Sequence, residues 1–170
     1  GLTRRRLPGD DQVPDPQLET TRAIKIDAPA EAVWPWLAQL GQRRGGWYSY
    51  EQLENLAGCK IENADSILPQ YQDVEVGDRL RLGPEGFPFF TVVEVTPGRA
   101  LVLKGGPVPP EDEDDVEWSW AFVLDRPDAG TTRLIARNRV DYEPTLANRI
   151  QWRGLIDPIA FVMERKMLHT

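Results

Sequence analysis

The residue types that most often carry chemistry in proteins are scarce in this sequence of 170 residues. It contains one histidine, His169, and one cysteine, Cys59. Histidine is the usual general base near neutral pH and the commonest metal ligand, but we expect a frayed position for His169, away from any internal site. The sequence therefore argues against a histidine-dependent triad and against a structural zinc site. We expect no metal, no cofactor and an inert thiol at Cys59, which has no base candidate nearby.

Two carboxylates lie in the most apolar sequence surroundings, Glu94 and Glu164. A buried carboxylate can act as a general acid or base, whereas an exposed or ion-paired one has no catalytic role. The second interpretation is favoured for both. The acidic run at 111–115 lacks the spacing and the glycine of a calcium loop, and predicts a solvated loop.

Aromatic side chains are the stronger candidates for ligand contacts. Trp47, Tyr48 and Tyr50 follow a pair of glycines, and they either form the rim of a pocket or fill the core. Trp118 and Trp120 share one face of a strand with Phe122, so they either fill the interior or narrow a cavity there. The complete set of predicted ligand-contacting residues is Trp47, Tyr48, Tyr50, Phe90, Trp118, Trp120, Asn138 and Phe161.

Alternation in the strand predicted at 133–141 leaves two orientations open. Asn138 shares a face with Leu134, Ala136 and Val140, whereas Arg137 and Arg139 lie on the opposite face. If the apolar face points inward, Asn138 can orient a ligand and the two arginines are solvated. In the reverse register, Arg137 would anchor a ligand carboxylate.

Hydrophobic periodicity predicts the elements that position these residues. A period of two predicts strands at 20–27, 79–82, 89–95, 100–104, 116–124 and 133–141. A helical period predicts two short helices after the first strand, at 27–41 and from Ser49 to Gly58, and a long helix from about Thr145 that restarts or kinks at Asp157-Pro158. Short connections make consecutive strands antiparallel. The predicted fold class is α+β, a helix-grip fold in which a curved antiparallel sheet wraps around the long C-terminal helix.

Composition limits the domain organisation, the partners and the location of the chain. Residues 1–18 are rich in proline and predict an extended or disordered arm, followed by a single domain at 19–170. The net charge of -7 disfavours nucleic acid and other anionic partners. No apolar run is long enough for stable membrane insertion. The single cysteine favours a reducing, cytoplasmic location, although Arg4–Arg6 would also suit the cytoplasmic flank of an upstream membrane helix.

Three sequence stretches resemble the START/polyketide-cyclase superfamily of helix-grip proteins, also called SRPBCC. They are the strand-to-helix junction Ile26-Asp27-Ala28-Pro29-Ala30-Glu31-Ala32-Val33-Trp34, the segment Gly45-Gly46-Trp47-Tyr48-Ser49-Tyr50, and the closing stretch from Phe161 to Leu168. The second and third resemble an uncharacterised bacterial branch. The resemblance covers residue 20 to the end and carries no catalytic set with it.

The resemblance implies that the chain binds or carries a small hydrophobic or amphipathic molecule, such as a lipid or polyketide, between the sheet and the C-terminal helix. Two alternatives remain: an enzyme of the polyketide cyclase or dehydratase type, and a non-catalytic interaction domain with a filled cavity. An inward ionisable residue would favour the enzyme, and a small cavity would favour the interaction domain. The oligomeric state stays open.

Overall fold

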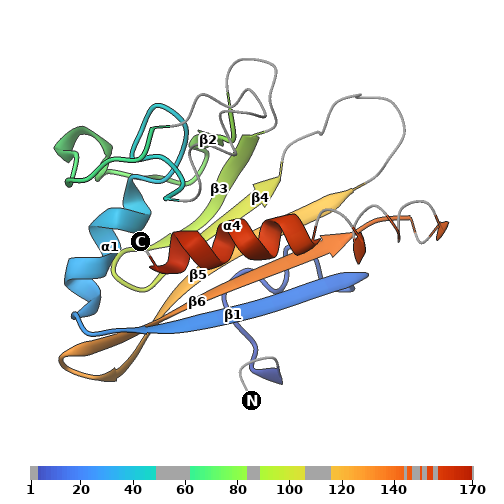
Figure 1. Cartoon of the computed structure of the whole chain (residues 1–170), viewed down its shortest axis with the longest axis horizontal. Coiled ribbons are helices and arrows are strands. Elements are labelled where there is room, and N and C mark those ends of the chain that lie inside the picture. Colours follow the sequence, from blue (N-terminus) through green and yellow to red (C-terminus); the bar gives the residue numbers. More distant parts are fainter. Residues whose placement is uncertain are drawn as a thin grey trace.

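The computed structural model describes residues 4–48, 62–83, 89–105, 116–143, 145–146, 150, 153–154 and 157–169. Its centre is a six-stranded antiparallel sheet in the order β1-β6-β5-β4-β3-β2 (Figure 1). The strands are β1 Leu18–Ile26, β2 Arg79–Arg81, β3 Phe89–Thr96, β4 Ala100–Gly105, β5 Glu117–Asp128 and β6 Thr131–Asp141. All six strands agree with the sequence periodicity, with end points that differ by a few residues.

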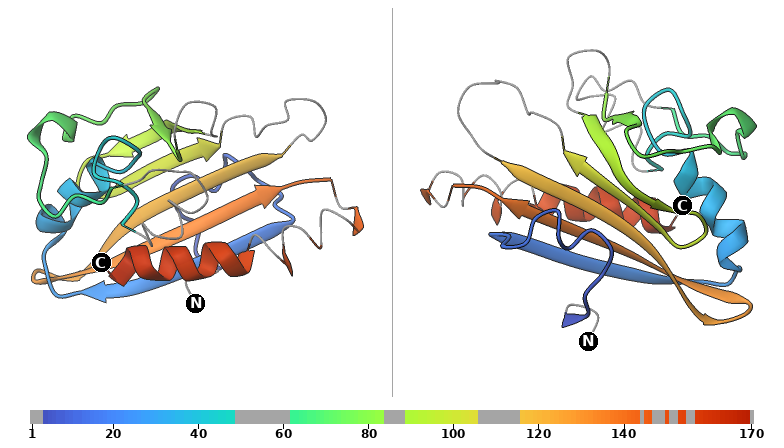
Figure 2. Two further views of the ribbon diagram at one scale, coloured as in Figure 1. Left: turned by 45° about the horizontal axis from the view of Figure 1, so that its top comes forward. Right: turned by 180° about the vertical axis from the view of Figure 1, so that it is seen from behind.

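Helix α4, Asp157–His169, lies along one face of the sheet, and helix α1, Ala30–Ala38, stands at one end of it (Figures 1 and 2). A single 3₁₀ turn, η2, spans Pro69–Tyr71. The expected helical stretch from about residue 145 to 156 includes residues outside the described ranges and stays a prediction. Helix α4 itself is short, at 13 residues, and begins at Asp157, where the sequence predicts that the closing helix restarts or kinks. Its start at Asp157-Pro158 has a physical reason, because proline has no N–H to continue a preceding helix.

The second predicted helix, at 49–58, lies outside the described residues. Among the helices of the described ranges, none has both the length and the apolar character needed to cross a membrane.

Both faces of the central strands are covered. We call the face toward α4 the inner face and the opposite one the outer face. Along β5, Trp118, Trp120 and Phe122 point inward, whereas Ala121 and Val123 point outward. Ala121, Phe122 and Val123 are buried. The main core lies between the inner face, α1 and α4, and a smaller one on the outer face.

Strand β5 is longer than its sequence pattern indicates, because it runs on through Pro127 to Asp128. The pairing of β5 with β6 shifts register between Asp125 and Asp128. A proline is tolerated in a strand at such an irregularity, where no ladder hydrogen bond is lost.

The N-terminal residues 4–17 cross the outer face of the sheet, as the view from behind in Figure 2 shows. Leu7 and Val13 are buried there, at 4 % and 0 % exposed. Leu7 joins Ala100, Val123 and Ile135 in the outer core. In the described chain, this stretch therefore packs against the sheet.

Candidate functional site

A buried carboxylate on α4 faces three strands of the inner face. The side chain of Glu164 is 4 % exposed. Its Oε1 accepts hydrogen bonds from Trp120 Nε1 and Asn138 Nδ2, both at 3.1 Å. Its Oε2 pairs with the guanidinium of Arg22. A further hydrogen bond of 3.0 Å runs from Trp118 Nε1 to Asn138 Oδ1. These five residues form one connected group, here called the inner polar cluster.

Strand register brings the cluster together. Trp120 on β5 pairs with Asn138 on β6, and Asn138 pairs in turn with Thr20 on β1. Arg22 lies two residues beyond Thr20 and so projects from the same face. Because β1, β6 and β5 are adjacent in the sheet, a residue of α4 that crosses above them can reach all three strands at once.

The cluster contains an ion pair. Glu164 carries one negative charge, Arg22 one positive charge, and the other donors are neutral. Both carboxylate oxygens accept hydrogen bonds, which a buried charge needs if it is to be stable away from water.

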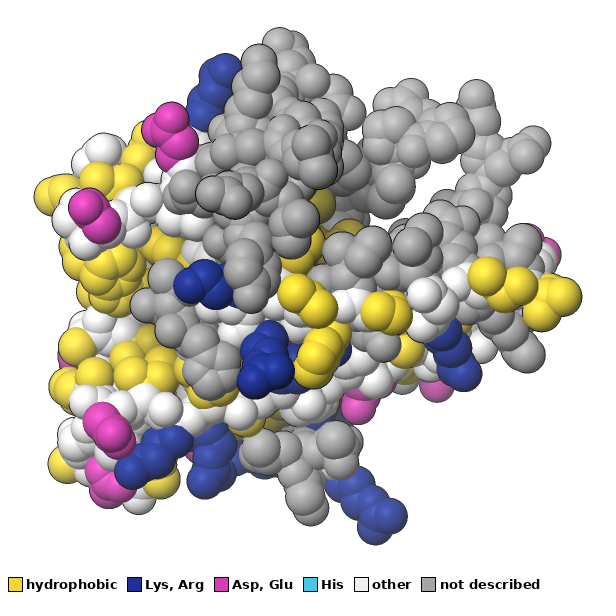
Figure 3. Space-filling view, in the orientation of Figure 1, with side chains coloured by type: hydrophobic (Ala, Val, Ile, Leu, Met, Phe, Trp, Pro, Cys, Tyr) yellow, Lys and Arg dark blue, Asp and Glu magenta, His cyan; other side chains and the backbone are white. Residues whose placement is uncertain are grey.

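Phe161 lies at the rim of the cluster, one turn before Glu164 on α4. The Arg22 guanidinium carbon is 4.9 Å from the centre of the Phe161 ring, within the range of a cation–π contact. The Phe161 side chain is 44 % exposed. On the visible face of α4 in Figure 3, hydrophobic and basic side chains lie together; the exposed residues of this part of the helix are Phe161, Val162, Arg165 and Lys166.

Aromatic rings continue from the inner polar cluster into the core. The Trp120 ring stacks on Trp47, with centroids 5.6 Å apart and planes within 9°. Phe90 lies against Trp118 at 4.8 Å and against Trp120 at 5.8 Å. Trp47 and Phe90 are buried, at 3 % and 0 % exposed, whereas Trp118 and Trp120 are half-buried. The two half-buried indoles therefore join the polar cluster to a closed aromatic core.

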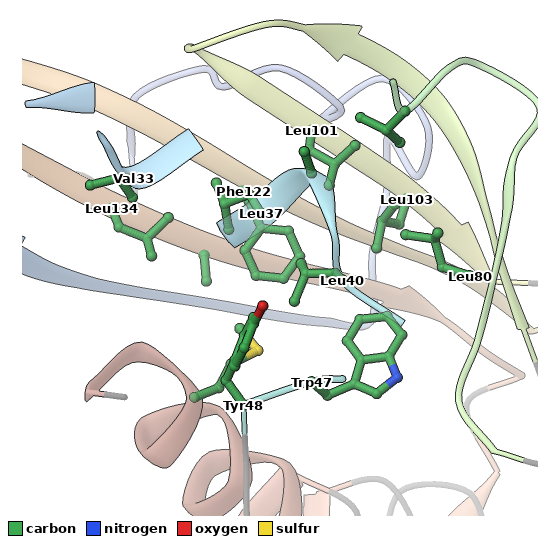
Figure 4. Packing of buried hydrophobic residues seen from close by; sticks show 14 of the residues in the cluster. Val33, Leu37, Leu40, Trp47, Tyr48, Leu80, Leu101, Leu103, Phe122 and Leu134 are labelled. Carbon is green, nitrogen blue, oxygen red and sulfur yellow. The ribbon is translucent and has the colours of Figure 1, made fainter. Parts of the chain in front are cut away.

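Tyr48 belongs to a different neighbourhood. Its hydroxyl accepts a hydrogen bond of 2.7 Å from Gln39 Nε2, and its ring meets Trp36 edge-on at 5.8 Å. Figure 4 shows Tyr48 and Trp47 pointing into the packed space beside Leu37, Leu40 and Phe122. Burial raises the pKa of Tyr48, and the hydrogen bond from Gln39 only partly offsets this. Its phenol therefore stays neutral and engaged in the core.

The structure thus gathers most of the predicted ligand-contacting residues. Trp47, Phe90, Trp118, Trp120 and Asn138 form one network, with Phe161 at its rim, while Tyr48 lies apart in the packed core. Tyr50 lies outside the described residues.

Arg22 was not among the predicted site residues, although its place in the strand pattern indicates a buried partner. Arg22 shares the inner face of β1 with Ile24 and Ile26, and a cation on an otherwise apolar face signals a buried partner. Its partner Glu164 stands out by its apolar surroundings, but the two are 142 residues apart in sequence.

The orientation of β6 is settled, and one expectation is corrected. Asn138 faces inward, as its hydrogen bond to Glu164 requires. The expectation that Arg137 and Arg139 would then be solvated is wrong, since Arg137 is only 2 % exposed. The N-terminal residues lie over the outer face and enclose it.

Across the described ranges, no group of three or more His, Cys, Asp or Glu side chains is arranged to hold a metal ion.

No protein-family model matches the sequence, and no curated protein sequence is similar to it. Solved structures do match. A Thermobifida fusca protein aligns with 88 % of this chain and 90 % of its own, at 14 % identity and a TM-score of 0.52. The ZhuI aromatase/cyclase from Streptomyces sp. R1128 aligns over 89 % of each chain, at 15 % identity and a TM-score of 0.50.

DynU16, a protein from the dynemicin biosynthetic locus, aligns with 91 % of this chain at 14 % identity and a TM-score of 0.51. The chain spans only 47 % of the length of DynU16. These matches confirm the helix-grip fold that the sequence resemblance implies. At such low identity they show the fold alone.

Proposed function

We propose that this protein binds a small amphipathic molecule on the inner face, between the sheet and α4, and releases it chemically unchanged. The observation that carries the proposal is the inner polar cluster, in which the two indoles of Trp118 and Trp120 are half-buried. Ligand sites in proteins combine apolar and aromatic walls with a few oriented polar groups. Trp118 and Trp120 would contact the apolar part of the ligand, and Asn138 and Arg22 would orient its polar end.

The fold supports the same proposal at a coarser level. A helix-grip domain of this kind suggests a ligand-binding space between its sheet and its closing helix. One neighbour of the same fold is named as an aromatase/cyclase, which implies that this architecture can hold a polyketide-like molecule. Lipid-like and polyketide-like compounds are therefore the first ligands to test.

One observation favours an enzyme instead: Glu164 is an inward carboxylate. A cyclase or dehydratase would use it as an acid or base, together with a phenol. Here both oxygens of Glu164 are held by donors, and the Tyr48 hydroxyl is bonded to Gln39. Asn138 and Arg22 take part in the same contacts, but orienting a ligand requires no proton transfer, so we rank binding first.

A second alternative, an interaction domain with a filled interior, is favoured by the buried rings of Trp47 and Phe90. It differs from the binding proposal in one measurable respect, because a filled interior takes up no ligand.

The first test is native mass spectrometry of the purified chain, with extraction and identification of any bound species. Binding is then quantified with a naphthalene-sulfonate fluorescent probe and a panel of lipids and polyketides. We expect Trp118→Ala to weaken binding at least about tenfold, equivalent to about 1.4 kcal/mol. Trp34→Ala is the matched control, because Trp34 is also a half-buried indole but lies on α1, and it should keep wild-type affinity.

The possible results separate the three functions. Equal effects of Trp118→Ala and Trp34→Ala would contradict binding at the inner face. No uptake of any compound would support the filled interaction domain. Loss of water from a bound polyketide, abolished by Glu164→Gln, would show that the protein is an enzyme.

A further inference from the structure

The outer face of the sheet, on the side away from the inner site, is covered by a segment of the chain itself. Residues 5–14, here called the arm, are seated on it. Leu7 packs against Ala100, Val123 and Ile135, and Val13 is completely buried. Figure 2 (right) shows the N-terminal segment crossing this face, on the side of the sheet away from α4.

A buried arginine provides the central anchor. Arg137 Nη1 contacts both carboxylate oxygens of Asp10, at 3.0 and 2.8 Å, and also donates to the Arg5 carbonyl at 3.0 Å. Its Nε donates to Thr21 Oγ1 at 3.0 Å, which orients the guanidinium toward the arm. Arg137 is 2 % exposed, and the Asp10 carboxylate gives it a compensating charge.

A second arginine holds the end of the arm. Arg139 Nε donates to the Val13 carbonyl at 2.8 Å, and its Nη2 donates to the Pro14 carbonyl at 2.9 Å. Its Nη1 also lies 3.3 Å from Asp10 Oδ1. The two arginines therefore recognise one carboxylate and three backbone carbonyls of the same short segment.

The arm forms a tight turn that packs closely against the sheet. Gly9 has φ +85°, and a Cβ at this position would lie 2.5 Å from Val102 Cγ1, so only glycine fits. The Leu7 N–H donates to Asp10 Oδ2 at 2.9 Å, and the Asp10 N–H donates to the Leu7 carbonyl at 3.2 Å. This turn presents Leu7 and Asp10 together.

The arm is attached to the sheet like a bound peptide. Within the described chain, the backbone–backbone hydrogen bonds of the arm run between its own residues, and its bonds to the sheet come from side chains. Only residues 15–17 separate it from β1, and they include Pro16. A short, stiff connection of this kind favours exchange of an element between identical chains, because every contact is preserved in the exchanged form.

We propose that the outer face is a docking site for the arm of a second copy of this chain. The surface beneath the arm, which includes Arg137 and Arg139, is here called the seat. The arm fits the seat residue by residue, and the acidic Asp10 complements its two arginines. In the single chain, the attached arm competes at an effective concentration of millimolar order, which keeps exchange low in dilute protein. Weakening the attached arm should therefore open the seat to another copy.

A complementation experiment tests this with full-length chains. Asp10→Asn leaves the seat intact but weakens the arm, whereas Arg137→Met leaves the arm intact but removes its anchor. Each variant alone should remain monomeric by sedimentation. Their mixture should form a heterodimer at least about tenfold more tightly than either variant self-associates, because the intact arm of one meets the intact seat of the other.

The matched control uses the exposed ion pair between Arg126 and Glu31, which lie 2.8 Å apart. A mixture of Arg126→Met and Glu31→Gln chains should stay monomeric. If the Asp10→Asn and Arg137→Met chains keep wild-type circular dichroism and their mixture stays monomeric up to millimolar order, the proposal is overturned.

A labelled synthetic peptide of residues 4–15 provides a second readout, which holds even if Arg137→Met fails to fold. The peptide should bind the Asp10→Asn chain at least about tenfold more tightly than the wild-type chain, whose own arm competes. The same peptide with Asp10→Asn should lose this preference. Peptide binding without a heterodimer would mean that the linker forbids exchange, and it would refute docking between copies.

Discussion

Replacement of Glu164 by leucine should destabilise the protein strongly, through the partners it leaves behind. The carboxylate is 4 % exposed, and its cationic partner Arg22 is 17 % exposed. Removal of one member of a buried ion pair typically costs 3–5 kcal/mol. Because water reaches part of Arg22, we take about 3 kcal/mol for the pair. Trp120 and Asn138 also lose an acceptor, which adds about 1 kcal/mol.

We therefore expect Glu164→Leu to lower the free energy of unfolding by about 4 kcal/mol. For a domain of this size, that corresponds to a fall of roughly 8–16 °C in melting temperature. Urea unfolding followed by tryptophan fluorescence measures the change, and the slope of the transition should stay constant if the folded state remains compact.

The double variant Arg22→Met/Glu164→Leu separates charge from packing. Replacing both members of a buried pair by apolar side chains is often close to neutral, so the double variant should lose only about 2 kcal/mol. Glu117→Gln is the control, since the ion pair of Glu117 with Lys104 is partly exposed and worth at most about 1 kcal/mol. A loss below about 1 kcal/mol for Glu164→Leu, or strict additivity in the double variant, would refute the reasoning.

Two further predictions concern the core and the arm. Burial raises the pKa of Tyr48, so its neutral form stabilises the fold at pH values below the ordinary tyrosine pKa of about 10. This contribution should disappear as the pH rises through the higher folded-state pKa, and Tyr48→Phe should not show that loss. At neutral pH, Tyr48→Phe should lower the free energy of unfolding by about 1 kcal/mol, because it removes the hydrogen bond with Gln39. Urea unfolding at a series of pH values measures both effects. Gly9→Ala should destabilise by about 2 kcal/mol more than Gly77→Ala, because both glycines have positive φ but only the Cβ at Gly9 would meet Val102; equal losses would contradict the close packing of the arm.

The strands were predictable because alternation is a local property. The pattern of Trp118, Trp120 and Phe122 against Ser119 and Ala121 specifies β5 without knowledge of any partner. The inner position of Asn138 followed from the same rule once the apolar face was placed inward. In these strands the local pattern and the final packing agree, so the sequence was sufficient to locate the strands, whereas it left open which face of β6 points inward.

The arm and the ion pairs could not be predicted in this way. Residues 5–14 have no helical or strand period, and the strands beneath them are distant in sequence, as the pairing of Arg137 with Asp10, 127 positions apart, illustrates. The pairing of Glu164 with Arg22 spans a similar distance. Tyr48 has φ +55°, a conformation that non-glycine residues rarely adopt, and nothing in its neighbours signals it.

Strand β6 connects the two proposals through one physical rule. When both faces of a strand are covered, each polar side chain in it must find a partner on its own face. Arg137 and Asn138 are consecutive residues, so they point to opposite faces. The first meets Asp10 of the arm, and the second meets Glu164 of α4. A polar pair in a strand buried on both faces thus lies at both proposed functional surfaces of this sheet, and the same pattern in the sequence of another helix-grip protein would predict a covered outer face there as well.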